Sequence, residues 1–175
     1  YELWVTRNFD NAVEALARSL RLAETAEAHV LLASARLYLG QVDAAYASIN
    51  AAIRRDRSIP TLFRVVLGQI HFAAGRYNDA VDELTIALRE LPPVDTGAGM
   101  TESSCPGFHL IVSQFYLGND EEAARAWKTY GWFRKRWQDI CALYVEPQIR
   151  DRFYTGLEKV KAMYFAREGE LKSGG

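Results

Sequence analysis

The segment GRYNDAVDELTIALRELPP, residues 75–93, combines a glycine turn, an amphipathic helix and a proline stop. Gly75 accepts a positive φ at little cost, so a preceding helix can end there. From Ala80 onward, apolar and small residues recur at spacings of three and four, which places them on one face of a helix. Pro92 and Pro93 cannot continue that helix. The segment therefore predicts the second helix of a helix–turn–helix unit.

The same pattern occurs elsewhere in the chain. Residues 31–53 align with residues 66–88 at an offset of 35 residues, which places Gly40 on Gly75. Residues 110–130 fit the same register, and an incomplete copy precedes them near the start of the chain. Repeats of this length are pairs of helices that bury their apolar faces only against neighbouring pairs. About four stacked helix pairs are therefore predicted.

The repeat resembles the tetratricopeptide repeat family. Units of that family carry Leu-Gly in the first helix, Gly and Tyr at the turn, two Ala in the second helix and a terminal Pro. The third copy matches at Leu67, Gly68, Gly75, Tyr77, Ala80, Ala87 and Pro92. The resemblance implies an all-α fold, a right-handed superhelix of antiparallel helix pairs with a C-terminal capping helix. It departs from the family at Arg36, His71 and Gln114, which stand where an aromatic is usual.

The resemblance divides the chain into two parts. Residues 1–135 are expected to form about four helix pairs, the first incomplete, with a polar, Gly-rich loop inserted at 92–104. Residues 136–175 are expected to form a capping helix region and a tail. Within them, residues 148–168 follow Pro147 and have apolar residues at helical spacing, but lack the Ala pair. A solenoid needs such a terminal helix to cover its last repeat.

A second, shorter resemblance concerns residues 147–160, PQIRDRFYTGLEKV. Together with the repeats, this segment resembles the end of the helical-repeat region that follows the catalytic domain in some bacterial class III adenylate cyclases and related signalling proteins. The resemblance rests on an Arg, an aromatic and a Gly-Leu pair in one helix. It implies that the chain is a regulatory part of a larger bacterial signalling protein, with any catalytic domain upstream of Tyr1.

Composition narrows the possible partners and the compartment. The 175 residues are 49% hydrophobic, and the formal net charge is −1, so no global field favours nucleic acid or an anionic membrane. No apolar run approaches the roughly 18 residues that a membrane span needs. Cys105 and Cys141 lack metal-knuckle or disulfide-scaffold spacing, which suits a reducing cytosol. We therefore predict a cytoplasmic protein without a membrane partner.

No residue pattern points to catalysis. His29, His71 and His109 lie in three different first helices, and none has a His or carboxylate three or four residues away, the spacing of a helical metal site. The triplet Asp-Thr-Gly at 95–97 occurs once, whereas an aspartic protease needs two. We therefore predict that this fragment is not an enzyme and has no catalytic residue, cofactor site or metal site.

A nucleic-acid-binding helical repeat module is the alternative function. Residues 127–137, WKTYGWFRKRW, interleave aromatic and basic side chains that could stack on bases and hold phosphates. However, Trp127, Tyr130, Phe133 and Trp137 share one helical face, which favours a core role for them. The nearly neutral chain also argues against this alternative, so nucleic acid is an unlikely partner.

The resemblance places the binding surface on the first helices of the repeats. We call the corresponding residues of this chain the groove positions. They contain no basic clamp, and most of them are apolar. The groove positions are Trp4 in repeat one, Val30, Ser34 and Leu37 in repeat two, Val65, Gln69 and Phe72 in repeat three, and Phe108, Val112 and Phe115 in repeat four.

An apolar strip of this size is too large to stay bare, so something must cover it. Three occupants are possible: an amphipathic helix of a protein partner, a second copy of the chain in a homodimer, or the chain's own helix 148–168. The strip could also be ordinary packing between helices, because the polar Arg36 and His71 leave the helix rotation open. The sequence favours a protein–protein interaction module, scaffold or regulatory, over an enzyme.

Overall fold

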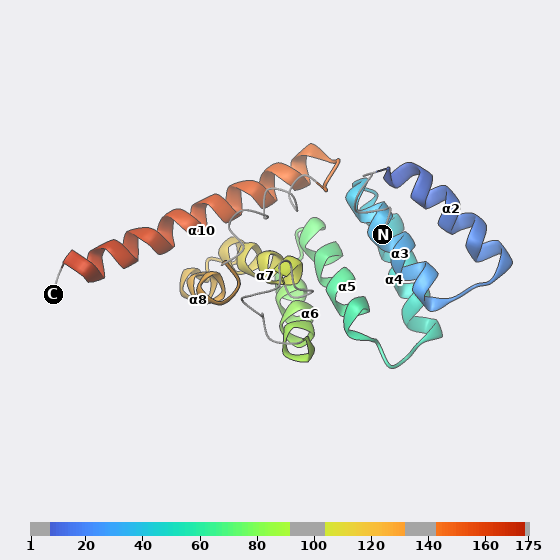
Figure 1. Cartoon of the computed structure of the whole chain (residues 1–175), viewed down its shortest axis with the longest axis horizontal. Helices are drawn as coiled ribbons and strands as arrows, with labels where there is room; N and C mark the ends of the chain where they lie inside the picture. Colours follow the sequence, from blue (N-terminus) through green and yellow to red (C-terminus); the bar gives the residue numbers. More distant parts are fainter. Residues whose placement is uncertain (1–7, 92–103, 132–142, 174–175) are drawn as a thin grey trace, which may run out of the picture.

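The computed structural model describes residues 8–91, 104–131 and 143–173, which contain eight α-helices and no strand (Figure 1). This confirms the predicted all-α helical-repeat fold class. The helices are α2 (Phe9–Leu22), α3 (Ala26–Tyr38), α4 (Val42–Arg55), α5 (Thr61–Ala73), α6 (Tyr77–Glu90), α7 (Ser104–Tyr116), α8 (Asp120–Tyr130) and α10 (Pro147–Ser173).

Seven of the described helices belong to the repeats. The pairs α3–α4, α5–α6 and α7–α8 pack internally, and each packs on the next, while α2 packs on α3 as the second helix of repeat one. About eight repeat helices were expected. The expected piece of the first helix of repeat one falls on residues 1–7, outside the described residues, as does most of the predicted loop 92–104.

Glycines end the first helix of each complete pair, as the repeat register predicts. Gly40, Gly75 and Gly118 have φ values of 77°, 75° and 77°, which side chains with a Cβ rarely adopt. After each glycine, the next amide donates to a carbonyl five residues earlier, as Arg76 does to His71. This hydrogen bond satisfies a carbonyl at the helix end and starts the return into the second helix.

Small residues allow the two helices of a pair to approach closely. Ala45, Ala80 and Ala123 are each fully buried at equivalent positions of α4, α6 and α8. At Gly68 in α5, a Cβ would lie 2.6 Å from Cγ of Leu84 in α6. The Leu-Gly and Ala positions of the repeat therefore set the spacing within a pair.

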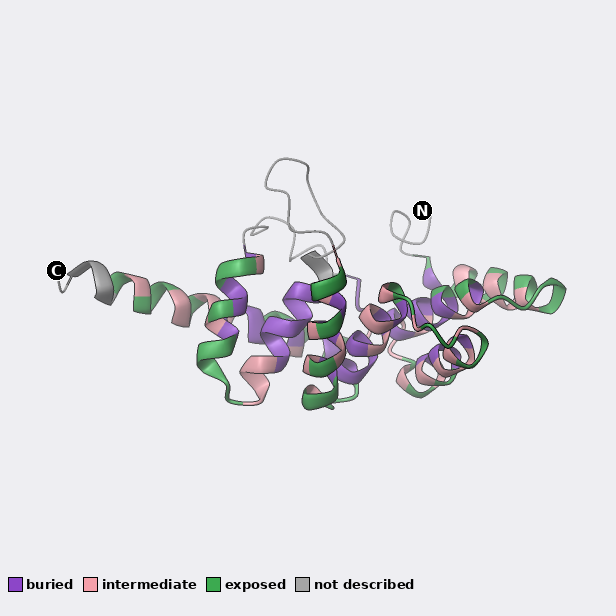
Figure 2. Ribbon diagram, turned by 90° about the horizontal axis from the view of Figure 1, so that it is seen from below, coloured by how far each residue is buried: buried purple, intermediate pink, exposed green. Residues whose placement is uncertain are grey.

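Helix α10 lies across the repeats instead of continuing them. It packs on α7 and α8, and its C-terminal end extends away from the other helices (Figure 1). Buried positions along α10 end at Val160, and residues 161–169 are half-buried or exposed (Figure 2). The first half of α10 thus belongs to the core that runs through the repeats, and the second half does not.

Candidate partner-binding groove

The structure brings nine of the ten groove positions onto three neighbouring first helices, α3, α5 and α7. Trp4 lies outside the described residues. Val65 and Phe115 are half-buried, whereas the other seven are buried. The buried groove positions are Val30, Ser34, Leu37, Gln69, Phe72, Phe108 and Val112.

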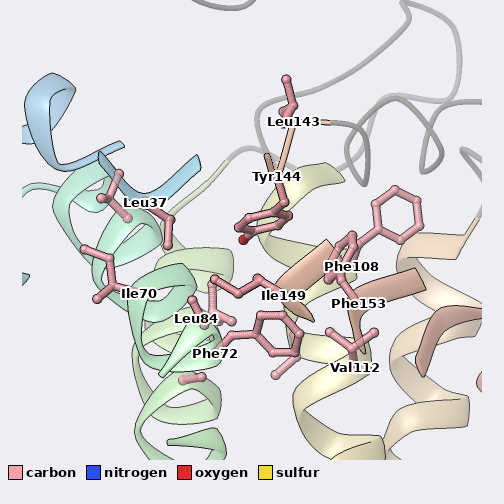
Figure 3. Packing of buried hydrophobic residues seen from close by; sticks show 14 of the residues in the cluster. Leu37, Ile70, Phe72, Leu84, Phe108, Val112, Leu143, Tyr144, Ile149 and Phe153 are labelled. Atoms are coloured by element: carbon pink, nitrogen blue, oxygen red, sulfur yellow. The ribbon is translucent and has the colours of Figure 1, made fainter. Parts of the chain in front are cut away.

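Residues 143–160, here called the C-terminal segment, cover part of this surface. Phe153 of α10 is fully buried, with its ring centroid 5.6 Å from that of Phe72 on α5 and 4.5 Å from that of His109 on α7. Figure 3 shows Phe153 among Phe72, Phe108 and Val112. A buried aromatic of this kind is the main anchor that an interface helix provides.

Arg152 fixes the segment to the end of α5. Its guanidinium donates to the carbonyl oxygens of Phe72 at 3.2 Å and Ala73 at 2.6 Å, in the last turn of that helix. A cation there gives the carbonyls at the helix end a further donor and interacts favourably with the helix dipole. The guanidinium carbon also lies 5.2 Å from the centroid of the Phe72 ring. Arg152 therefore adds directional contacts to the apolar contact of Phe153.

A glycine allows α10 to approach α7 closely. A Cβ at Gly156 would lie 3.1 Å from side-chain atoms of both Val112 and Tyr116. The Tyr116 hydroxyl donates to the carbonyl oxygen of Arg152 at 2.7 Å. Nζ of Lys159 lies 5.9 Å from the ring centroid of Phe115. Arg152, Gly156 and Lys159 of α10 therefore all contact α7.

The residues before α10 reach the first complete pair. The backbone amide of Val145 donates to the carbonyl oxygen of Tyr38, at the end of α3, at 2.7 Å. The Tyr144 hydroxyl is hydrogen-bonded to Nε2 of His109 at 2.7 Å, and both residues are fully buried. The C-terminal segment thus contacts α3, α5 and α7, the three described first helices.

The sequence predicted the apolar face of α10 but not its polar attachments. Phe153, Leu157 and Val160 have the helical spacing from which a buried face was expected, and all three are fully buried. Arg152 is hydrogen-bonded to Ala73, about 80 residues away in sequence, and Tyr144 to His109, 35 residues away. No local pattern signals such pairings.

The comparison with known families bears on the central repeat. Residues 26–59, which contain α3 and α4, match the family model of the tetratricopeptide repeat. This segment is therefore similar in sequence to a tetratricopeptide repeat. No curated protein and no solved structure matches the chain significantly. Tetratricopeptide repeats generally mediate protein–protein interaction and are typically not catalytic.

Part of the surface of the first helices α3 and α5 stays exposed. Leu62, in the first turn of α5, is 55% exposed, and Leu31 of α3 is 40% exposed. Val65, one turn after Leu62, is half-buried. The C-terminal segment contacts the opposite ends of these helices, at Tyr38 and Phe72.

The described residues cover the predictions on metal, membrane and nucleic-acid binding in part. They contain no group of three His, Cys, Asp or Glu side chains that could hold a metal ion. None of the described helices combines the length and hydropathy required to cross a membrane. Trp127 is buried, so its ring is not available for base stacking, and residues 132–137 lie outside the described part.

His71 occupies one of the three positions where the tetratricopeptide repeat usually has an aromatic. It is buried, its ring packs edge-on against Tyr46 of α4, and its Nδ1 lies 3.7 Å from a carboxylate oxygen of Asp79. Burial lowers the pKa of His71 below its ordinary 6.5. The positive charge of Arg76 lowers this pKa further, whereas Asp79 and Glu83 oppose the shift.

We expect this lowered pKa to make stability fall in mild acid. Below about pH 6.5, His71 is protonated more readily in the unfolded chain than in the folded chain. The free energy of unfolding therefore decreases as the pH falls below this value. The slope is at most about 1.4 kcal/mol per pH unit, because one proton is involved. Urea unfolding at pH 7.5, 6.5 and 5.5 measures it. The slope should be smaller in His71→Gln, and an equal slope in both proteins would contradict this assignment.

Proposed function

We propose that the chain is a non-catalytic protein–protein interaction module that binds an amphipathic helix on the surface formed by α3, α5 and α7. One observation carries the proposal: the chain's own α10 docks there through Phe153, a fully buried anchor between α5 and α7. The same surface can therefore accept a helix. A partner helix would replace the C-terminal segment at the groove positions.

The anchors of α10 describe the partner helix. Ile149, Phe153, Leu157 and Val160 are buried and follow one helical stripe. A partner would need apolar residues at the same spacing, with an aromatic at the position of Phe153 and a basic residue beside it. The proposed partner is thus an amphipathic helix with a basic residue, and not an acidic extended peptide.

A second copy of the chain could supply that helix. Because each copy carries the same α10, exchange of the C-terminal segment between two copies would form a homodimer with the contacts of the monomer. Light scattering tests this route, since exchange would give a dimer whose fraction rises with concentration.

We also propose that the chain is one part of a larger signalling protein. The resemblance of residues 147–160 suggests a cytoplasmic regulatory module of a bacterial signalling protein such as an adenylate cyclase. In that setting, release of the C-terminal segment would couple partner binding to the catalytic domain. The reading frame upstream of Tyr1 tests this, and a frame without a catalytic domain would contradict it.

Competition with a peptide tests the proposed helix binding. The probe is a fluorescent peptide of residues 143–165, titrated onto the intact chain and followed by anisotropy. Arg152→Met removes the hydrogen bonds to Phe72 and Ala73 and should loosen the chain's own segment. Charge-assisted hydrogen bonds of this kind contribute about 1.5–3 kcal/mol, so the peptide should bind this variant roughly ten- to a hundredfold more tightly than the parent chain.

The control is Arg150→Met, because the one described partner of Arg150 is its neighbour Asp151 on the surface. It should leave peptide affinity unchanged. A peptide with alanine in place of Phe153 and Leu157 should not bind. Equal binding of both peptides, or no binding to any variant, would show that this surface does not accept a helix.

A further inference from the structure

A second candidate site lies between α2, α3 and α4, apart from the groove positions that α10 contacts. It is an open surface pocket of about 310 Å³ with mostly apolar walls. Pockets of this size are at the lower end of the range for small-molecule sites. Its lining residues are Ala17, Leu20, His29, Leu32, Arg36, Ala47, Ser48 and Ala51.

The pocket has a cause in the sequence. Arg36 stands where the tetratricopeptide repeat usually has an aromatic, and it projects between the two second helices α2 and α4. In the next repeat the equivalent His71 packs against the Tyr46 ring, with centroids 5.8 Å apart. Val13 is the counterpart of Tyr46 in α2. The two packed rings of the next repeat thus correspond to an arginine and a valine here, and of these two Arg36 lines the pocket.

Arg36 brings a charge to this space. One of its terminal nitrogens donates to Ser48 Oγ at 2.7 Å and to the carbonyl oxygen of Ala44 at 3.3 Å. No carboxylate forms an ion pair with it in the described part of the chain, whereas the half-buried Arg64 pairs with Glu83 at 2.9 Å. A guanidinium has five N–H donors, so Arg36 retains donors for a further acceptor.

Glu24, whose carboxylate is hydrogen-bonded to the lining residue His29, does not supply this acceptor. Glu24 directly precedes the N-cap of α3. Its carboxylate pairs with Arg55 and, at 3.1 Å, with Nε2 of His29. Its pKa is lowered by these hydrogen bonds, so it stays ionised and engaged. Arg36 is thus a half-buried cation beside an apolar pocket, with no acidic partner among the described residues.

We propose that this pocket binds a small carboxylate with an apolar body. The carboxylate would accept hydrogen bonds from the free donors of Arg36, in the planar geometry that guanidinium and carboxylate share. The apolar body would pack on Leu20, Leu32 and Ala51. The site does not depend on the proposed function, because it lies on the second-helix side of the repeat and involves neither α10 nor a groove position.

Nuclear magnetic resonance titration of the intact chain tests this site with 3-phenylpropionate as the probe. Backbone amides of Leu32, Ser48 and Ala51 should shift on binding. The uncharged 3-phenylpropanamide, which has the same body, should bind at least about tenfold more weakly, as expected for loss of a charge-assisted hydrogen bond. A peptide with a C-terminal phenylalanine and free carboxylate distinguishes a protein terminus from a free small molecule as the source.

Two variants and one control complete the test. Arg36→Met should abolish the difference between acid and amide, and Ala51→Leu, which fills the pocket without touching the charge, should abolish binding of both. Arg76→Met removes a cation that lies over the Tyr46 ring of α4 and does not line the pocket, so it should change neither. Equal binding of acid and amide to the parent chain, or shifts away from these residues, would overturn the proposal.

Discussion

Replacing Phe72 by glutamate is expected to prevent folding of the repeats or to lower the free energy of unfolding by more than about 4 kcal/mol. Phe72 is fully buried, and its ring contacts Tyr77, His109 and Phe153. A carboxylate at this point would lose its hydration among aromatic rings. Arg152 would be the one nearby cation among these contacts, and it already bonds two carbonyls of α5. Circular dichroism during urea unfolding measures the loss.

Leu62→Glu is the matched control, because Leu62 lies on the same helix and is 55% exposed. It should change stability by no more than about 0.5 kcal/mol. If Phe72→Glu were as stable as this control, Phe72 would face solvent and the C-terminal segment would not cover it. The same pair of variants thus separates a core position from an open groove.

Replacing Phe153 by alanine is expected to cost about 3–5 kcal/mol of the contact between α10 and the repeats. The ring is fully buried between Phe72, His109 and Tyr144, and alanine would leave a cavity that these rings cannot fill. Because α10 packs mainly on α7 and α8, the loss should first release α10 and then expose the last repeat. Hydrogen exchange by mass spectrometry should therefore quicken in 147–160 and α7, and least in α2.

The neighbouring Tyr154→Ala serves as the control for Phe153→Ala. Tyr154 is 44% exposed on the outer side of α10. Its removal should leave exchange in α7 unchanged. Similar exchange in both variants would mean that Phe153 does not anchor the segment.

The repeat architecture could be predicted because its signals are local. Gly75 marks a turn that needs a positive φ, and Pro92 follows a helix that ends at Glu90. Ala80 is fully buried, as expected for a close helix contact. Each of these features depends on neighbours within one repeat, so the 35-residue period exposes them in a single sequence.

The occupant of the groove positions could not be predicted for the opposite reason. The pattern at Phe72 shows an apolar strip, but a partner, a second copy and α10 would all satisfy it. The choice depends on the hydrogen bonds from Arg152 to α5 and from Val145 to Tyr38, which join distant parts of the chain. Neither residue belongs to a repeating pattern.

The departures from the tetratricopeptide pattern were visible, but their consequences differ between repeats. The His71 ring packs against the Tyr46 ring and is buried. Arg36 instead faces small residues of α4, and a pocket remains beside it. The difference arises from the preceding second helix, where Val13 and Tyr46 occupy equivalent positions. Whether a pocket forms at such a departure therefore depends on the side chains of the neighbouring helices, which the repeat pattern does not specify.

A nuclear Overhauser measurement on the intact chain tests most directly whether the chain's own C-terminal segment occupies the surface of the first helices. The ring centroids of Phe153 and His109 are 4.5 Å apart, and those of Phe153 and Phe72 are 5.6 Å apart. We expect cross-peaks from the Phe153 ring to both His109 and Phe72, in dilute samples where the chain is monomeric. Absence of these cross-peaks, with rapidly exchanging amides in 147–160, would contradict it.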